Sequence, residues 1–345
     1  MLSYSLLAGM DEAGTDNGMG NMSIIIMGTG NWGATLAGLT NPEIPVRLWC
    51  ETEKFLTPTR DRLKEIAGAQ RSSTVVETVF SSPLTKDDIV LVVVPSSQIK
   101  PVAQQIRDHG EPPYPVIVTA SKGLERATFR TMSQVISAII PEATVAVLSG
   151  PNIASEIAAG RPAKAVLGCE DIHILLRVAK TLRSDRFHLE MTRDTVDVEL
   201  CAAMKGVFAI GAGVIAARNM GCNFMGLLMA AGLHEISEIG RFLGISTDHV
   251  FGVAGLGDLV ATCFSSDSRN FRLGQLLAQN VSLKDALKEV HMVVEGAMTA
   301  AAVAEMGTLR LHLPLFAAIA AIVENPGEST IQQFERTLLD YPNHP

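Results

Sequence analysis

The chain has 345 residues, enough for two domains, and its 47% hydrophobic and 19% charged residues are typical of a globular protein. A net charge of -8 and only 5% aromatic residues argue against nucleic acid and acidic membranes as partners. The cysteines and histidines show no metal-ligand spacing. We therefore expect no metal site and reduced, mostly buried thiols in a cytoplasmic protein.

The first 21 residues differ in character from the rest. They contain Asp11, Glu12, Asp16 and several glycines, which is atypical of a signal or transit peptide. We expect residues 1–21 to be a disordered leader, with Met22 as an alternative start of the chain.

The next part of the chain alternates runs of β-branched residues with helical segments. Strands are predicted over residues 23–27, 46–50, 89–94, 116–120 and 143–148. Because the runs are apolar throughout, they predict a doubly wound, mostly parallel sheet with both faces covered.

The composition changes near residue 192, after which Ala, Leu, Met and Gly dominate. Asp194 or Thr195 is expected to cap a long helix that runs through Ala217. The charge-free stretch 206–217 is too short to span a bilayer, so we expect a buried helix and no membrane span. The all-helical part is rich in Ala and Gly, which suits either a tight core or a homodimer interface.

A glycine motif, Gly28-Thr-Gly30-Asn31-Trp32-Gly33, directly follows the first predicted strand and opens a helix. This is the context of a dinucleotide-binding loop. The first glycine permits the turn, the second lets the backbone approach a pyrophosphate, and the third lets helix and strand pack closely. The helix N-terminus favours the phosphates. We therefore predict a Rossmann domain over residues 22–192 and a helical substrate and catalytic domain over residues 193–345.

Glu51 ends the second predicted strand. An acidic side chain at this place accepts the ribose hydroxyls of NAD and repels the 2′-phosphate of NADP. The sequence thus predicts NAD or NADP as cofactor, with NAD favoured, and the alternative is that Glu51 is a solvated loop residue. Arg47 lies within the strand and is not expected to reach a 2′-phosphate.

Lys205 lies in an otherwise apolar helical segment, with no carboxylate at helical spacing to pair with it. Apolar neighbours lower the pKa of a lysine toward the range useful for proton transfer, although most lysines of this kind are surface residues. Asp258 is a lone carboxylate on a glycine-rich turn. Downstream, Thr262 and the Ser268-Arg269-Asn270 run suit phosphate binding, with a solvated loop as the alternative.

Several motifs in the same order resemble those of the NAD(P)-dependent glycerol-3-phosphate dehydrogenases, from Met22 to about Leu315. The matching motifs are Gly28–Gly33, Val94-Pro95-Ser96, Ser121-Lys122-Gly123, Leu148–Asn152 with Ala154 and Glu156, Gly255–Leu259, Thr262-Cys263, Ser268–Asn270 and Val294-Glu295-Gly296.

The resemblance implies that Lys205 is the general acid/base at the substrate C2 oxygen and that Asp258 orients or tunes it. It implies that the substrate is bound by Lys122, Gly150, Asn152, Thr262, Ser268, Arg269 and Asn270. It implies that the cofactor is bound by Gly28, Gly30, Asn31, Trp32, Gly33, Glu51, Pro95, Lys122, Ala154, Arg269, Val293 and Glu295.

The chain departs from the family pattern after the catalytic lysine. Gly206 stands in place of Asn, Ala216-Ala217 in place of Asp-Gly, Asn223-Phe224-Met225-Gly226 in place of Asn-Thr-Lys-Ala, and Ala231 in place of Arg. We expect this stretch to border the substrate pocket.

The resemblance predicts reduction of dihydroxyacetone phosphate to sn-glycerol 3-phosphate for glycerophospholipid synthesis. Two alternatives stay open at this stage. One is a related dehydrogenase for a different phosphorylated ketone or hydroxyacid, which Phe224 and Met225 favour. The other is a nucleotide-binding sensor without turnover, against which the retained Lys205 and Asp258 speak.

Overall fold

The computed structural model describes residues 22–66, 74–80, 82–126, 128–182, 184–291, 293–306 and 311–341, so the predicted leader 1–21 lies outside the described residues. It divides into two compact units. The first runs to Ser121 and continues over Met132–Thr195, and the second combines Lys122–Thr131 with the chain from Val196 onward. The prediction of a single domain boundary near residue 192 missed that the segment Lys122–Thr131 belongs to the second unit.

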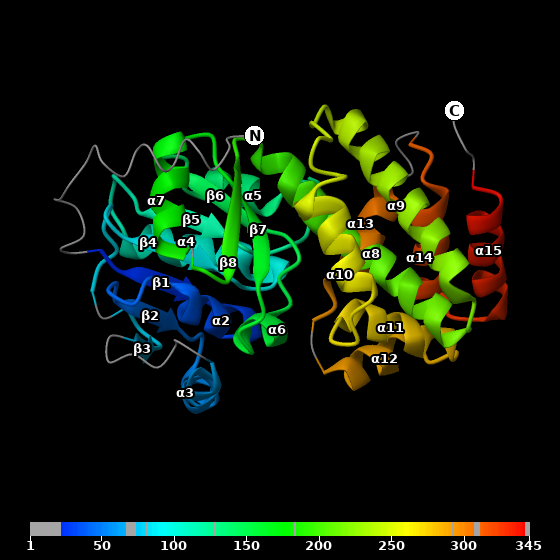
Figure 1. Cartoon of the computed structure of the whole chain (residues 1–345), viewed down its shortest axis with the longest axis horizontal. Coiled ribbons are helices and arrows are strands. Elements are labelled where there is room, and N and C mark those ends of the chain that lie inside the picture. The colour runs from blue at the N-terminus through cyan, green and yellow to red at the C-terminus, as the bar shows by residue number, and fades with distance from the viewer. Residues whose placement is uncertain are drawn as a thin grey trace. The chain divides into compact units, whose positions relative to one another are not determined.

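An eight-stranded sheet forms the centre of the first unit within the described residues (Figure 1). Its order is β3-β2-β1-β4-β5-β6-β7-β8, and every neighbouring pair is parallel except β6 and β7. The strands are β1 (Ile24–Met27), β2 (Val46–Trp49), β3 (Thr74–Glu77), β4 (Ile89–Val92), β5 (Val116–Thr119), β6 (Val145–Ser149), β7 (Ala163–Gly168) and β8 (Phe187–Thr192). The predicted mostly parallel sheet is confirmed.

The five predicted strands correspond to β1, β2, β4, β5 and β6. The other three were not predicted. Strand β3 lies at the edge of the sheet and buries only Val76, and β7 and β8 interrupt their apolar residues with Lys164, His188 and Glu190. Half-exposed or mixed runs of this kind do not stand out as buried parallel strands.

The sheet is covered on both faces. Ile24 and Ile26 belong to one hydrophobic cluster and Ile25 and Met27 to another, because successive side chains of a strand point to opposite faces. The first unit's helices are α2 (Asn31–Leu39), α3 (Leu56–Glu65), α4 (Ile99–His109), α5 (Met132–Ile139), α6 (Ala154–Ala158) and α7 (Ile172–Leu182). Helices α2 and α7 contribute to the first cluster and α4 and α5 to the second, as in a doubly wound fold.

The second unit is helical, as predicted (Figure 1). After the segment Lys122–Thr131 it contains α8 (Thr195–Ala217), α9 (Gly221–Leu243), a π-helical turn (Val253–Gly257), α10 (Asp258–Cys263), α11 (Arg269–Ala278), α12 (Leu283–Val290), α13 (Glu295–Met306), α14 (Pro314–Glu324) and α15 (Glu328–Leu339). By length and composition α8 could cross a membrane, but 83% of its most apolar window is buried inside the protein, as in the core helix of a globular unit.

Backbones touch where α8 crosses α11. A Cβ atom on Gly213 would lie 2.0 Å from the Phe271 carbonyl oxygen, and one on Gly274 would lie 1.9 Å from the Ile210 carbonyl oxygen. No side chain fits at either place, so both glycines are needed for this crossing. The crossing brings the start of α11, with Arg269 and Asn270, alongside α8.

A pair of glycine substitutions tests this packing. We expect Gly274→Ala to lower the free energy of unfolding by about 1–3 kcal/mol or more, because the new methyl meets backbone that cannot move aside. The control is Gly226→Ala on α9, where a Cβ would meet nothing within 4 Å. That change should raise the free energy of unfolding by about 0.4–1 kcal/mol. Urea unfolding measures both, and two changes of the same sign would contradict the packing described.

Candidate active site

In the first unit, the predicted cofactor residues gather at one edge of the sheet. Met27 at the end of β1 lies opposite Trp49 of β2 and Val92 of β4, so the three strands end at the same level. The glycine motif follows β1, Glu51 follows β2, and Pro95 follows β4. Nucleotides bind at this carboxyl edge in doubly wound sheets, where the strand order reverses.

The three glycines of the motif are required for different reasons. Gly28 has φ +118°, and a Cβ there would lie 2.4 Å from the Val93 carbonyl oxygen. A Cβ on Gly33 would lie 2.0 Å from the Gly28 carbonyl oxygen. Gly30 has an ordinary φ of -66°, and its Cβ would meet no described atom within 4 Å. The protein itself therefore gives no reason for a glycine at position 30, which fits a bound pyrophosphate as the reason.

The start of α2 also fits a phosphate. No side chain caps this helix end, and its first backbone N–H groups would otherwise need partners. Asn31 is exposed at this end, whereas Trp32 packs its ring against Phe187, with 6.2 Å between ring centroids. The residues of this loop therefore fit the pyrophosphate of NAD or NADP, and Trp32 also stabilises the loop by packing.

A second loop on the same edge follows β6. Gly150 has φ +131°, a conformation that favours glycine, and Ala154 begins α6. Ser149 Oγ and Asn152 Oδ1 are buried, and neither has a hydrogen-bond partner among the described residues. Buried polar atoms are nearly always paired, so these two atoms mark a place where a ligand or water binds.

In the second unit, one carboxylate joins two lysines. Asp258 Oδ1 accepts a hydrogen bond from Lys205 Nζ, and Asp258 Oδ2 accepts one from Lys122 Nζ at 2.7 Å. Lys205 Nζ also donates to Thr262 Oγ1 at 2.8 Å. The Asp258 side chain is only 2% exposed, compared with 14% for Lys205 and 24% for Lys122. The sequence analysis singled out Lys205 and Asp258, which the structure brings into contact, but it gave no indication that Lys122 shares the carboxylate.

The local fold explains the position of Asp258. The π-helical turn precedes α10, and Gly255 there would place a Cβ 2.1 Å from the Val250 carbonyl oxygen. Only glycine permits this fold of the backbone. The turn ends at Gly257, and Asp258 then starts α10 with Thr262 one helical turn later. Both side chains therefore lie on the same face of α10.

The surroundings lower the pKa of Lys205 from 10.5 to about 7. Burial is the largest cause, and the neighbouring charge of Lys122 acts in the same direction. The Asp258 carboxylate opposes both by favouring the charged ammonium. A lysine of this kind gives up and regains a proton near neutral pH, as a general acid/base requires.

The predicted phosphate-binding residues stand at the start of α11. Asn270 Oδ1 accepts a hydrogen bond from Gly296 N at 2.9 Å, and Arg269 Nη1 donates to the Val293 carbonyl oxygen at 2.9 Å. Ser268 Oγ accepts from Phe271 N at 3.2 Å and so caps α11. Ser268 thus has a structural contact that the sequence did not reveal. Val293 is exposed, and Glu295 begins α13.

Gly206 is the one departure from the family pattern that touches these residues. A Cβ at Gly206 would lie 3.0 Å from Gly296 Cα and 3.1 Å from Asn270 Nδ2. A side chain at this position would therefore press against the backbone of Gly296 and the amide of Asn270. The glycine instead lets α8 and α13 approach and leaves the space to Asn270.

The other departures lie elsewhere in the helical unit. Gly232 of α9 faces Phe208, and Gly211 of α8 faces Leu228, which means that α8 and α9 run antiparallel. Residues 216–217 and 223–226 therefore lie at the end of this helix pair that is remote from Lys205, about 15 Å along α8. Ala231 is buried in the helical core. Phe224 and Met225 are therefore not neighbours of Lys205 along this helix pair.

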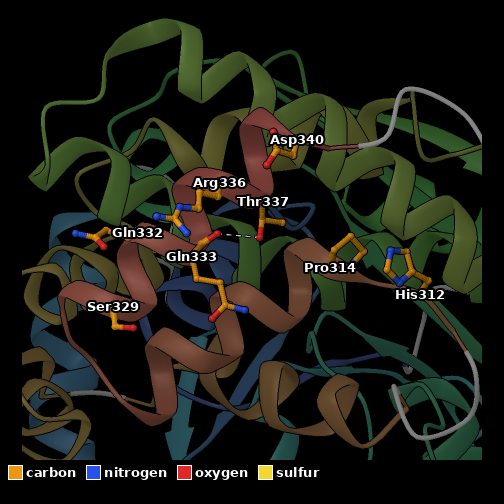
Figure 2. A pocket seen from close by; sticks show the side chains of 8 residues that line it. All are labelled: His312, Pro314, Ser329, Gln332, Gln333, Arg336, Thr337 and Asp340. Carbon is orange, nitrogen blue, oxygen red and sulfur yellow. Dashed lines mark hydrogen bonds between the residues drawn. The ribbon is translucent and has the colours of Figure 1, made fainter.

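A cavity of about 550 Å³ lies between the start of α14 and α15 and shares no residue with the lysine cluster (Figure 2). Its lining includes His312, Gln332, Gln333, Arg336 and Thr337, and Thr337 Oγ1 donates to the Gln333 carbonyl oxygen. It contains none of the residues predicted to bind cofactor or substrate. Despite its volume, this cavity is therefore separate from the candidate reaction site.

Comparison with known proteins agrees with this geometry. Residues 23–175 match the model of the NAD-dependent glycerol-3-phosphate dehydrogenase N-terminus, and residues 194–332 match that of the C-terminus. A glycerol-3-phosphate dehydrogenase [NAD(P)+] from Synechococcus elongatus is 35% identical over 302 residues, which cover 87% of this chain and 91% of that relative. One from Mycobacterium avium is 31% identical over 331 residues, 93% of this chain and 95% of the relative.

This chain belongs to the NAD-dependent glycerol-3-phosphate dehydrogenase family. The solved structure of the Coxiella burnetii glycerol-3-phosphate dehydrogenase has a TM-score of 0.81 at 25% identity and covers 91% of this chain and 98% of its own. The Plasmodium falciparum glycerol-3-phosphate dehydrogenase, at 18% identity, shares the fold with a TM-score of 0.80 over 99% of each chain. Membership confirms the predicted class, an oxidoreductase that uses NAD or NADP.

The nucleotide loop of this family member can be tested by separating folding from binding. We expect Gly30→Ala to leave the free energy of unfolding within about 0.5 kcal/mol, because the backbone conformation suits alanine and the space is open. The same change should weaken NADH binding about tenfold or more, because the methyl occupies the place of a phosphate and its charged hydrogen bonds.

Gly33→Ala is the matched control for that variant. Its Cβ would collide with the Gly28 carbonyl oxygen, so it should lose stability as well as NADH binding. Urea unfolding and fluorescence titration with NADH measure the two effects. Wild-type NADH affinity in Gly30→Ala would contradict the assignment of this loop.

Proposed function

We propose that this chain catalyses the reversible, NAD(P)H-dependent reduction of dihydroxyacetone phosphate to sn-glycerol 3-phosphate, which supplies glycerophospholipid synthesis. The observation that carries the proposal is the buried Lys205, whose pKa is lowered to about 7 and whose ammonium is held by Asp258 and Thr262. A proton donor of this kind is what reduction of a ketone needs.

The first unit supplies the residues that fit the cofactor. Gly28, Gly30 and Gly33 shape the loop for the pyrophosphate, and the start of α2 contributes backbone donors and the helix dipole. Glu51 follows β2 at the place where ribose hydroxyls are bound. When bound, the nicotinamide supplies the hydride for C2 of the substrate.

Lys205 supplies the proton. An ammonium group has three N–H donors, and the structure shows one directed to Asp258 and one to Thr262. The third is the donor for the C2 oxygen of the substrate. As negative charge develops on that oxygen, Lys205 transfers its proton and becomes the neutral amine, and the reverse reaction returns the proton.

The remaining cations suit the phosphate of the substrate. The protein has a net charge of -8, so an anionic substrate needs a local concentration of positive charge. Lys122, Lys205 and the start of α11 with Arg269 provide it in the second unit. Asn270, fixed by Gly296 N, offers its amide group for a hydroxyl or phosphate oxygen.

Cofactor binding is thus assigned to residues 22–192 and the catalytic lysine to residues 193–345, with Lys122 added from the segment Lys122–Thr131.

A cytoplasmic location and a homodimer stay predictions. The free cysteines, four of which are buried, support the first, and sedimentation in solution tests the second.

Replacement of the proton donor gives the first functional test. We expect Lys205→Ala to lower kcat for dihydroxyacetone phosphate reduction by about 10²–10⁴-fold, because general acid catalysis is lost. Affinity for NADH should change little, because the loop that fits the pyrophosphate lies in the first unit and does not include Lys205. Lys288→Ala, on the exposed surface of the same unit, is the control and should keep full activity. Normal turnover in Lys205→Ala would refute the assignment.

The pH dependence gives the second test. Reduction needs protonated Lys205, so its rate should fall as the pH rises through about 7, while the oxidation rate rises. Asp258 raises the pKa of Lys205, so in Asp258→Asn the loss of reduction should move to lower pH. The profiles of kcat/KM in both directions measure this. A shift to higher pH would show that Asp258 does not act on Lys205 in this way.

A further inference from the structure

The ends of β1 and β2 define where the adenosine ribose of the cofactor would bind. Met27 of β1 pairs with Trp49 of β2. Thr29 and Glu51 each lie two residues beyond this pair, so both follow the strand ends at the same level. Gly28 N also donates to the Trp49 carbonyl oxygen at 3.4 Å, so the two segments stay close after the strands end. The ribose 2′ oxygen is read at this place in dinucleotide-binding folds.

An arginine from a separate helix reaches the same place. Arg62 of α3 donates from Nη1 to the Thr29 carbonyl oxygen at 2.6 Å, across 33 residues of sequence. A guanidinium group has five N–H donors, and the structure shows no second hydrogen bond or ion pair for Arg62 within the described residues. Among the described residues, Arg62 is therefore anchored beside the nucleotide loop through one of its five donors.

The described arginines of β2 and of the rest of α3 are less suited to bind a 2′-phosphate. Arg47 pairs with Glu77 at 2.8 Å and donates to Ser82 Oγ at 2.9 Å, so its guanidinium is engaged in the sheet. Arg60 of α3 is exposed and makes only a 3.5 Å contact with the Val76 carbonyl oxygen.

We propose that Arg62 binds the 2′-phosphate of NADP(H) and so lets this site accept NADP(H) alongside NAD(H), for which Glu51 selects. A guanidinium group binds a phosphate through two parallel hydrogen bonds and through the attraction between its positive charge and the negative phosphate. Glu51 is exposed, and its carboxylate serves the ribose hydroxyls when no 2′-phosphate is present. The proposal rests on the cofactor site of the proposed dehydrogenase but needs no turnover to be tested.

The structure also allows a simpler role for Arg62, in which its hydrogen bond to Thr29 braces the loop and does nothing more. The two roles differ in what they recognise. A brace affects every nucleotide equally, whereas a 2′-phosphate ligand affects only nucleotides that carry that group.

Calorimetric titration of the full chain with 2′,5′-ADP and with 5′-AMP separates these roles. We expect wild type to bind both ligands, because Arg62 offsets the repulsion between Glu51 and the 2′-phosphate. Arg62→Gln should weaken 2′,5′-ADP binding about tenfold or more and change 5′-AMP binding less than about threefold. Arg62→Lys should lie between, because it keeps the charge but loses the paired hydrogen bonds. Arg60→Gln, two residues away on the same helix, is the control and should change neither.

Three results would overturn the proposal. They are equal weakening of both ligands in Arg62→Gln, unchanged binding of both, and wild type that binds 5′-AMP but not 2′,5′-ADP. If Arg62→Gln does not fold, Arg62→Lys provides the same comparison of the two ligands. Turnover of dihydroxyacetone phosphate with NADH is measured separately, so failure of the proposed reaction leaves the 2′-phosphate result readable.

Discussion

The Asp258 carboxylate shared between Lys122 and Lys205 is the interaction on which the rest of the account depends. A buried carboxylate alone would take up a proton, and a buried lysine alone would lose one, because burial penalises each charge. For Lys205, burial and the charge of Lys122 lower the pKa, while the Asp258 carboxylate raises it, and the balance lies at about 7. In the proposed reaction this balance lets Lys205 release a proton to a developing alkoxide, while Asp258 and Thr262 accept its other N–H groups.

Close backbone contacts hold this cluster in place. Gly255 lets the chain turn so that α10 begins at Asp258, while Gly213 and Gly274 bring α11 against α8. Gly206 and Gly296 do the same for α8 and α13 and leave the space that Asn270 fills. The second unit therefore places a lysine, a carboxylate and an amide with little freedom, which general acid catalysis requires.

The sequence predicted the features that arise from local patterns. Apolar strand runs revealed five of the eight strands, and the glycine motif located the nucleotide loop. A lone lysine in an apolar helix pointed to Lys205, whose lowered pKa the structure bears out.

The features that the sequence did not predict depend on contacts between distant segments. Lys122 lies 136 residues from Asp258, and Arg62 lies 33 residues from Thr29. The distance of residues 216–226 from Lys205 follows from the antiparallel packing of α8 and α9, which the sequence did not show. No local pattern encodes which side chains meet across such distances.

The most direct test of the central claim is the titration of Lys205 itself. An amine-reactive reagent labels only the neutral amine, so the labelling rate of the Lys205 peptide, followed by mass spectrometry across pH, reports its pKa. We expect a half-maximal rate for Lys205 near pH 7. A half-maximal rate for Lys205 in the ordinary lysine range, at about pH 10, would contradict its role as the proton donor.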